Sequence, residues 1–197
     1  MIALLDRVDD TARAIGAVNT VVREGDALVG SNTDWLGVAR ALERETTLAG
    51  KTAVVLGAGG TARATLYALR QRGARAVVLN RTPGKAEALV NELGAERSGA
   101  LEELAATPHD ILVNTTSVGL KSDESPVDAA ALRAGSVVLD AVYDPLETRL
   151  LRDARARGAR AVSGKWMLIE QAREQLRAWS GVSVDARVME AAFDRAG

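Results

Sequence analysis

Short apolar runs alternate with amphipathic segments through the middle of the chain. Runs such as AVVL, at residues 53–56, end abruptly in glycine or polar residues, which is typical of strands buried on both faces. Between these runs, apolar residues recur at helical spacing. The pattern predicts strands within residues 51–60, 74–82, 109–119, 135–145 and 159–164, and helices within residues 62–73, 85–94, 101–107 and 147–158.

The two ends of the chain follow a different pattern. Apolar residues at helical spacing predict a helix near the start, and two short strands around Glu24-Gly25-Asp26 predict a hairpin. The expected elements are a helix over 2–15, the hairpin over 17–31, a helix over 34–45, and two closing helices over 166–178 and 183–193.

The alternation of strands and helices determines the fold class that we expect. It predicts an α/β fold in which a parallel sheet is covered by helices on both faces, and right-handed crossovers make such a sheet doubly wound. In these folds ligands bind at the carboxyl ends of the strands. The loops that follow the predicted strands should therefore meet at one rim.

Composition excludes several classes of function. The net charge is −1 with both signs interspersed, unlike the basic excess of a nucleic-acid surface. The chain has no cysteine and only one histidine, His109, so thiol nucleophiles and Cys- or His-rich metal sites are excluded. No apolar run approaches the roughly 20 residues of a membrane span, and MIALLDRVDD does not fit a signal peptide. We expect a soluble, cytoplasmic protein that binds neither membranes nor nucleic acids.

The segment VVLGAGGTAR, residues 54–63, predicts a dinucleotide site. Gly57, Gly59 and Ala62 fit G-x-G-x-x-A between a strand and a helix, which is the fingerprint of a Rossmann-type fold. The glycines allow a tight turn and a close approach of backbone N–H groups to a pyrophosphate at the helix N-terminus. The alternative interpretation is a glycine-rich turn without a ligand.

The end of the second strand indicates which dinucleotide binds. A site for NAD has an acidic residue about 20 residues after the first glycine, to hold the ribose 2′-OH. The sequence there is LNRT, so Arg81 can pair with a 2′-phosphate, with Asn80, Thr82 and Lys85 nearby. We therefore predict NADP as the cofactor, and the alternative is a solvated turn.

Two further strands end in NTTSVGL, residues 114–120, and DAVYDP, residues 140–145, which should reach the nicotinamide half of the crevice. Asn114 and Ser117 have the alternative role of satisfying turn backbone. Together with IGAVNTVV, GSNTDWLG, GAGGTARA, NRT, VYDPLET and GKWMLIEQA, these motifs resemble the shikimate dehydrogenase family over essentially the whole chain.

The resemblance implies a fold and a reaction. The fold would be an NADP-binding Rossmann domain over residues 34–165, beside remnants of a smaller α/β substrate domain in residues 1–33, to which helices in 166–197 return. The reaction would be the reduction of 3-dehydroshikimate to shikimate with NADPH, in the biosynthesis of chorismate and aromatic amino acids. Quinate is an alternative substrate.

The resemblance also implies residue roles. Asp34 would be the carboxylate of the catalytic pair and would contact substrate together with Asn19, Tyr143 and Gln171. The residues expected at the cofactor are Gly57, Ala58, Gly59, Gly60, Thr61, Asn80, Arg81, Thr82, Lys85, Ala141 and Gly164. We expect Asp34 to be exposed, with a pKa near 4.

Each substrate residue also has a structural interpretation. Asn19 would be a polar hairpin residue, Asp34 a helix cap, Tyr143 a core residue and Gln171 a helix-surface residue. For Asp34, the roles of cap and catalyst are compatible.

The sequence departs from the family in one motif. The N-V-T-x-P-x-K pattern that carries the proton-transfer lysine is absent, and none of Lys51, Lys85, Lys121 and Lys165 is a plain replacement, although Lys165 should lie near the crevice. Three interpretations stay open: a truncated and impaired shikimate dehydrogenase, a non-catalytic NADP-binding module, or a quinate/shikimate-type dehydrogenase completed by a partner chain. The apolar hairpin residues predict self-association or a covering partner chain.

Overall fold

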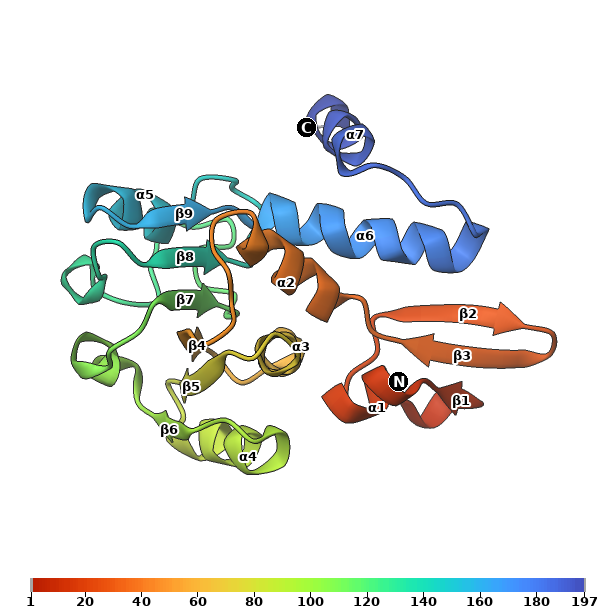
Figure 1. Ribbon diagram of the computed structural model, residues 1–197, viewed down its shortest axis with the longest axis horizontal. Coiled ribbons are helices and arrows are strands. Elements are labelled where there is room, and N and C mark those ends of the chain that lie inside the picture. The colour runs from red at the N-terminus through yellow and green to blue at the C-terminus, as the bar shows by residue number, and fades with distance from the viewer. Residues whose placement is uncertain (1, 197) are drawn as a thin grey trace.

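The computed structural model describes residues 2–196, which form a large and a small β-sheet (Figure 1). The large sheet consists of β4 (Thr52–Leu56), β5 (Arg75–Leu79), β6 (Arg97–Gly99), β7 (Ile111–Asn114), β8 (Val137–Asp140) and β9 (Arg160–Val162). All six strands are parallel, in the order β6-β5-β4-β7-β8-β9. The sheet thus starts at the central strand β4, adds β5 and β6 on one side, and continues from β7 on the other side of β4, as the predicted doubly wound fold requires.

Helices cover both faces of the large sheet. One face is covered by α2 (Asp34–Glu43), α3 (Gly60–Gln71) and α4 (Pro83–Leu93), and the other by α5 (Arg149–Ala156) and the 3₁₀ helices η2 (Leu101–Ala106) and η3 (Ala129–Ala131). Side chains of a strand alternate between these two cores, so Val55 packs toward α3 while Val54 and Leu56 pack toward α5. The predicted strands were correct, but the short polar strand β6 was not foreseen and residues 101–106 form a 3₁₀ helix.

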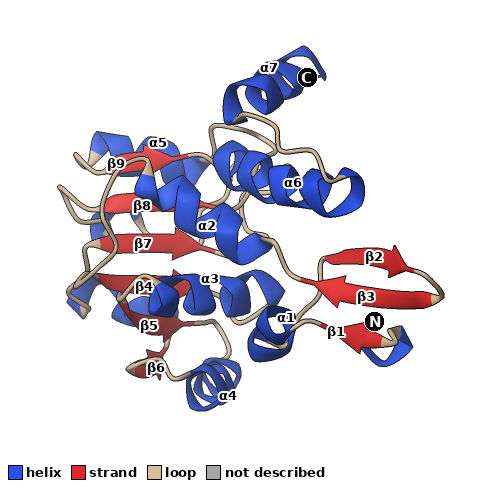
Figure 2. Ribbon diagram, turned by 45° about the vertical axis from the view of Figure 1, so that its right-hand side comes forward, coloured by secondary structure: helices blue, strands red, loops and turns tan. Residues whose placement is uncertain are grey.

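The small sheet projects away from the large one (Figures 1 and 2). It contains β1 (Arg7–Val8), β2 (Thr20–Glu24) and β3 (Ala27–Ser31) in the order β1-β3-β2, preceded by η1 (Ile2–Leu4) and interrupted by α1 (Asp10–Ile15). The antiparallel pair of β2 and β3 is the predicted hairpin.

The predicted helix over 2–15 is wrong in its first half. Asp9 is the N-cap of α1, where its Oδ1 accepts a hydrogen bond from the backbone N–H of Ala12 at 2.6 Å. The residues before this cap satisfy their backbone by pairing β1 in parallel with β3. A side-chain cap therefore overrides the apolar periodicity, and the helix starts eight residues later than predicted.

The helix α6 (Gly164–Ser180) joins the two sheets (Figure 2). It packs along α2, and at its far end the indole N–H of Trp179 donates to the carbonyl of Val21 at 3.1 Å. Together with Gln175, which donates to the carbonyl of Asn19 at 3.4 Å, Trp179 covers the free edge of β2. The last helix, α7 (Ala186–Ala196), packs on α6. Among residues 2–196, no helix is both long enough and apolar enough to cross a membrane.

Candidate active site

A cavity of about 190 Å³ lies where the rim of the large sheet meets α2 and α6. We call it the crevice cavity. Its lining residues are Asp34, Thr61, Ala141, Tyr143, Gly164, Met167, Leu168 and Gln171. Six of these eight residues are ones that the sequence predicted at a substrate or cofactor site, and they come from four separate segments of the chain.

A polar cluster forms one wall of this cavity. The side-chain amide of Asn19 donates to Asp34 Oδ1 at 2.7 Å and faces Gln171 Oε1 at 3.2 Å and Thr33 Oγ1 at 3.0 Å. The carbonyl oxygen of the Asn19 side chain accepts from the backbone N–H of Thr33 at 2.9 Å. Asn19 thereby orients Asp34 and Gln171, whose positions are 137 residues apart along the sequence.

Local structure explains why these side chains converge. Asp34 is the first residue of α2, where the positive end of the helix dipole favours a carboxylate. Its backbone N–H donates to Asn32 Oδ1 at 3.0 Å. A Cβ on Gly37 would lie 2.7 Å from the carbonyl oxygen of Met167 and 3.0 Å from Cβ of Gln171, so only glycine allows α2 and α6 to approach this closely. The close approach sets Asp34 and Gln171 side by side.

The ionisation of Asp34 differs from our expectation of an exposed carboxylate. The side chain is half-buried, and this burial raises its pKa above the ordinary value of 3.8, although the hydrogen bond from Asn19 acts in the opposite direction. A carboxyl group with a raised pKa holds a proton at higher pH than a free aspartate does. This property suits a group that exchanges a proton with a bound hydroxyl.

The glycine loop borders the same cavity. Gly57 has a φ of 107°, and a Cβ there would lie 2.8 Å from Thr115 Oγ1, so both the conformation and the space require glycine. Gly59 is the N-cap of α3, and a Cβ added to Gly59 or Gly60 would meet no atom within 4 Å. The open space in front of the helix N-terminus leaves room for a phosphate group.

The loop after β5 lies on the same rim, because β5 is the neighbour of β4 in the parallel sheet. The side-chain amide of Asn80 donates to the carbonyl of Thr82 at 2.9 Å and closes the turn before α4. Arg81, Thr82 and Lys85 are exposed. The guanidinium and ammonium groups are thus available to an anionic ligand beside the glycine loop.

A buried polar network supports the other side of the crevice. Asp140, which is fully buried, accepts hydrogen bonds from Asn114 Nδ2 at 2.9 Å, Thr148 Oγ1 at 2.7 Å and the backbone N–H of Val142 at 3.1 Å. Burial raises the pKa of Asp140, and these three hydrogen bonds oppose the shift. Asn114 also accepts from the backbone N–H of Thr116 at 3.0 Å, so its side chain does satisfy turn backbone. The network holds the loops after β7 and β8 in one arrangement.

The predicted residues divide into three groups in the structure. Asp34, Tyr143, Gln171, Thr61, Ala141 and Gly164 line the crevice cavity, Asn19 lies behind Asp34, and Gly57–Gly60 and Asn80–Lys85 extend along the rim. Tyr143 is 48% exposed, so its alternative as a core residue is wrong. Met167 and Leu168 were missed, although their position one turn before Gln171 on the same helix was a usable signal.

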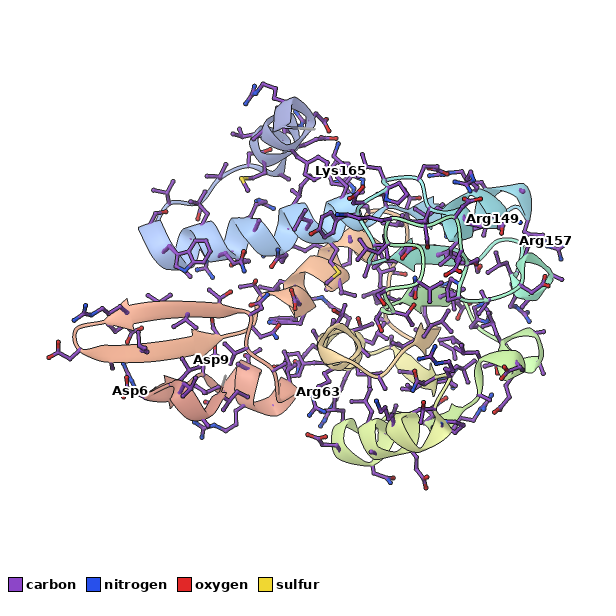
Figure 3. The ribbon with its side chains drawn as sticks, turned by 180° about the vertical axis from the view of Figure 1, so that it is seen from behind. Asp6, Asp9, Arg63, Arg149, Arg157 and Lys165 are labelled. Atoms are coloured by element: carbon purple, nitrogen blue, oxygen red, sulfur yellow. The ribbon has the colours of Figure 1, made fainter. Side chains whose placement is uncertain are left out.

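Lys165 points away from this site. Its ammonium group lies 2.7 Å from Asp194 Oδ1 and 3.3 Å from Glu190 Oε1, both on α7 (Figure 3). It is absent from the residues that line the crevice cavity, which weakens its candidacy as a replacement for the missing lysine. In the described part of the chain, no three His, Asp or Glu side chains gather in an arrangement that would hold a metal ion.

Two family models match the chain. One, described as shikimate / quinate 5-dehydrogenase, matches residues 39–123, and the other, the shikimate 5′-dehydrogenase C-terminal domain, matches residues 164–192. The regions matched contain the glycine loop, the LNRT segment and the first turns of α6.

Known proteins resemble the chain over nearly its whole length. The shikimate dehydrogenase (NADP(+)) of Pyrococcus abyssi is 43% identical over 187 residues, which cover 94% of this chain and 70% of that protein. The protein of the same description from Haloarcula marismortui is 46% identical over 182 residues, covering 90% and 69%. A crystal structure of shikimate 5-dehydrogenase from Thermus thermophilus, in complex with NADP(H) and shikimate, superposes with a TM-score of 0.92 at 42% identity and covers 100% of this chain and 74% of that one.

Proposed function

The chain belongs to the shikimate dehydrogenase family, and we propose that it is an NADP-dependent oxidoreductase that interconverts 3-dehydroshikimate and shikimate. The observation that carries this proposal is the crevice cavity, where Asp34 and Gln171 share a wall with Thr61 of the glycine loop. Substrate-type and cofactor-type residues thus border one space, as hydride transfer between two bound molecules requires.

The rim of the sheet fits NADP. The open N-terminus of α3 suits the pyrophosphate, and the exposed Arg81 and Lys85 suit the 2′-phosphate, with no carboxylate in the LNRT segment to repel it. When bound, NADPH supplies the hydride. Ala141 and Gly164, which line the crevice cavity, would contact the nicotinamide side.

The polar wall fits a small polyol acid. Asn19 and Gln171 carry neutral amides that suit substrate hydroxyls. Asp34 already accepts a hydrogen bond from Asn19 and would accept another from a substrate hydroxyl. Reduction of a ketone also needs a proton at the oxygen. The raised pKa of Asp34 suits its carboxyl to exchange a proton with a substrate hydroxyl. Tyr143 lines the same cavity and would contact the carbon ring of the substrate.

Turnover by this chain alone should be slow. The sequence lacks the lysine motif of the family, and Lys165 is paired with α7. General acid–base assistance typically contributes 10²–10⁴-fold to rate, so its loss leaves binding largely intact but impairs the chemical step.

NADPH oxidation with the purified chain tests the proposal. We expect tight NADPH binding by calorimetry and slow, 3-dehydroshikimate-dependent oxidation. Lys165→Ala should leave the rate unchanged, and Asp34→Asn should lower it about 100-fold. NADPH binding without any oxidation would favour a non-catalytic module instead. Because the matching family model includes quinate, oxidation of quinate by NADP⁺ should be measured in parallel.

We also propose that the hairpin face associates with a second copy or another chain. Leu28 is 40% exposed, and Val21, Val22 and Val29 are only half-buried, which leaves apolar surface on the small sheet. Light scattering should show a species larger than a monomer, and Leu28→Lys should reduce its apparent mass. A monomer that binds no hydrophobic dye would contradict this part of the proposal.

A further inference from the structure

We propose that Arg63 is a positioning residue that couples cofactor binding at the glycine loop to substrate binding at Asn19. The inference rests on the proposed function, because it assigns the two ligands to the two ends of one connection. It concerns neither a catalytic group nor a residue of the crevice cavity.

Arg63 joins three helices. Its backbone N–H donates to the carbonyl of Gly59 at 3.1 Å, which places Arg63 in the first turn of α3, directly behind the glycine loop. Its Nε donates to the carbonyl of Ile15, the last residue of α1, at 2.6 Å. Its guanidinium also forms an ion pair with Glu92 of α4, with one N–H···O distance of 2.9 Å. Figure 3 shows Arg63 between these elements.

The local structure is adapted to this contact. The Arg63 side chain is 19% exposed, unusually low for an arginine whose acidic partner is 56% exposed. Gly16 closes α1 with a φ of 72°, and a Cβ at this position would overlap the guanidinium. The planar fork of arginine serves a helix carbonyl and a carboxylate at once, which a lysine ammonium matches poorly.

A short segment connects the Arg63 contact to the substrate wall. Asn19 follows Ile15 by only four positions, and the carbonyl of Ala17 between them accepts from Asn32 Nδ2 at 3.0 Å. Asn19 in turn holds Asp34 at 2.7 Å. Because the segment is held at each end, a displacement of the α3 N-terminus is passed to Asn19 through Ile15 rather than absorbed by a free loop.

A ligand phosphate at the α3 N-terminus would act on the same turn that carries Arg63. The position of this turn determines where Ile15 lies, and hence where Asn19 presents its amide. Binding of NADP⁺ should therefore tighten binding of shikimate, and linkage requires the reciprocal effect to be equal.

Calorimetric titrations of NADP⁺, with and without saturating shikimate, test the inference. For the wild-type chain we expect shikimate to lower the Kd for NADP⁺ by about fivefold or more. In Arg63→Met this ratio should fall to about one, while the Kd of each ligand alone changes less than about threefold. Arg70→Met, at the opposite end of α3, should keep the wild-type ratio.

Other variants separate the contacts of Arg63. Glu92→Gln keeps the bond to Ile15 and should retain most of the coupling, and Arg63→Lys should restore part of it. A ratio preserved in Arg63→Met, or a wild-type ratio of one with both ligands bound, would overturn the inference and leave the proposed function standing. Loss of NADP⁺ binding in both Arg63 variants would assign Arg63 to the loop itself and also overturn it. A wild-type chain that binds neither ligand would refute the proposed function and the inference together.

Discussion

The large and the small sheet differ in where their strands find burial. Every residue of β7 and β8 is buried, as are four of the five residues of β4, whereas β2 and β3 each contain a single buried residue, Thr20 and Gly30. The large sheet is covered mainly by the helices of its own crossovers, together with α2, which immediately precedes β4. The small sheet instead depends on the short helix α1, which lies between β1 and β2, and on α6, which comes from the far end of the chain.

The difference assigns two tasks, cofactor binding and substrate binding, to different parts of the crevice. The glycine loop and the loop after β5 extend from β4 and β5, in each of which four of the five residues are buried. We therefore expect the cofactor side to resist local opening. Asn19 precedes an edge strand whose free carbonyls are covered by Gln175 and Trp179. The substrate wall is therefore held by hydrogen bonds between side chains of distant segments rather than by an enclosing core.

Truncation of matched leucines should show this contrast most strongly. Leu112→Ala, in the core of the large sheet, should lower the free energy of unfolding by about 2–5 kcal/mol, because a fully buried side chain leaves a cavity. Leu28→Ala, on the small sheet, should lower it by only about 0.5 kcal/mol. Urea titrations of both variants measure the difference, and equal losses would contradict the comparison.

Asp34→Asn should impair the reaction with substrate without changing cofactor binding. We expect kcat/KM for 3-dehydroshikimate to fall about 100-fold, equivalent to about 2.7 kcal/mol, because the substitution keeps the shape but removes the titrating carboxyl. The Kd for NADPH should not change. Asp26→Asn, in the exposed hairpin turn, serves as the control, and a loss of NADPH affinity in Asp34→Asn would argue against separate tasks.

Arg81→Ala should affect only the cofactor side. Loss of a charge-assisted contact of about 1.5–3 kcal/mol should raise the Kd for NADP⁺ about ten- to a hundredfold. The Kd for NAD⁺ should stay constant, since NAD⁺ lacks the 2′-phosphate. Arg157→Ala, at the end of α5, controls for the general loss of positive charge, and equal affinities of the wild-type chain for both cofactors would refute the proposed preference.

Gly37→Ala tests the close contact between α2 and α6, which lies between the two regions. An added methyl group would push α6 away from α2 and should cost about 1–2 kcal/mol of stability. The KM for 3-dehydroshikimate should rise severalfold, with little change in NADPH affinity. Gly84→Ala is the matched control, because a Cβ there meets no atom within 4 Å, and it should be neutral or slightly stabilising.

Lowering the pH should reveal a smaller effect on stability at His109, a buried residue shortly before β7. Burial lowers its pKa below the ordinary 6.5, while its Nδ1 lies 2.8 Å from the carbonyl of Thr107. As the pH falls through about 6.5, the unfolded chain takes up a proton that the folded chain resists, so the free energy of unfolding decreases until the lowered pKa is reached. Asp34 and Asp140, with raised pKa values, act in the opposite direction. The loss below pH 6.5 should thus be smaller in His109→Gln than in the wild-type chain, and identical profiles would contradict it.

The enclosed sheet was predictable because each strand carries its own signal. Apolar runs that end in glycine, asparagine or aspartate identify β4, β5, β7 and β8 without knowledge of their neighbours. The strand β6 has the sequence RSG, which carries no such signal, and its pairing with β5 provides its stability. The strand β1 could not be predicted for the same reason, because its two residues form a strand only through their pairing with β3.

The candidate site was predictable in part. The glycine loop and the LNRT segment could be assigned from local chemistry, since both act within a few residues of the chain. The proximity of Asn19, Asp34 and Gln171 depends on how α2 and α6 pack, which no periodicity encodes, and was expected only through the family resemblance. The buried Asp140 was missed because a carboxylate at a strand end looks the same in sequence whether it faces solvent or a network.

The indole of Trp179 has a spectroscopic consequence. It is 59% exposed and bonded to β2, while Trp35 packs edge-on against Tyr67 with ring centroids 5.3 Å apart, and Trp166 lies under Arg44. Fluorescence from the three tryptophans therefore samples two environments, one at the tip of α6 and one beside the large sheet. With Trp35 and Trp166 replaced by phenylalanine, the emission of Trp179 would report in real time on whether α6 stays in contact with the hairpin.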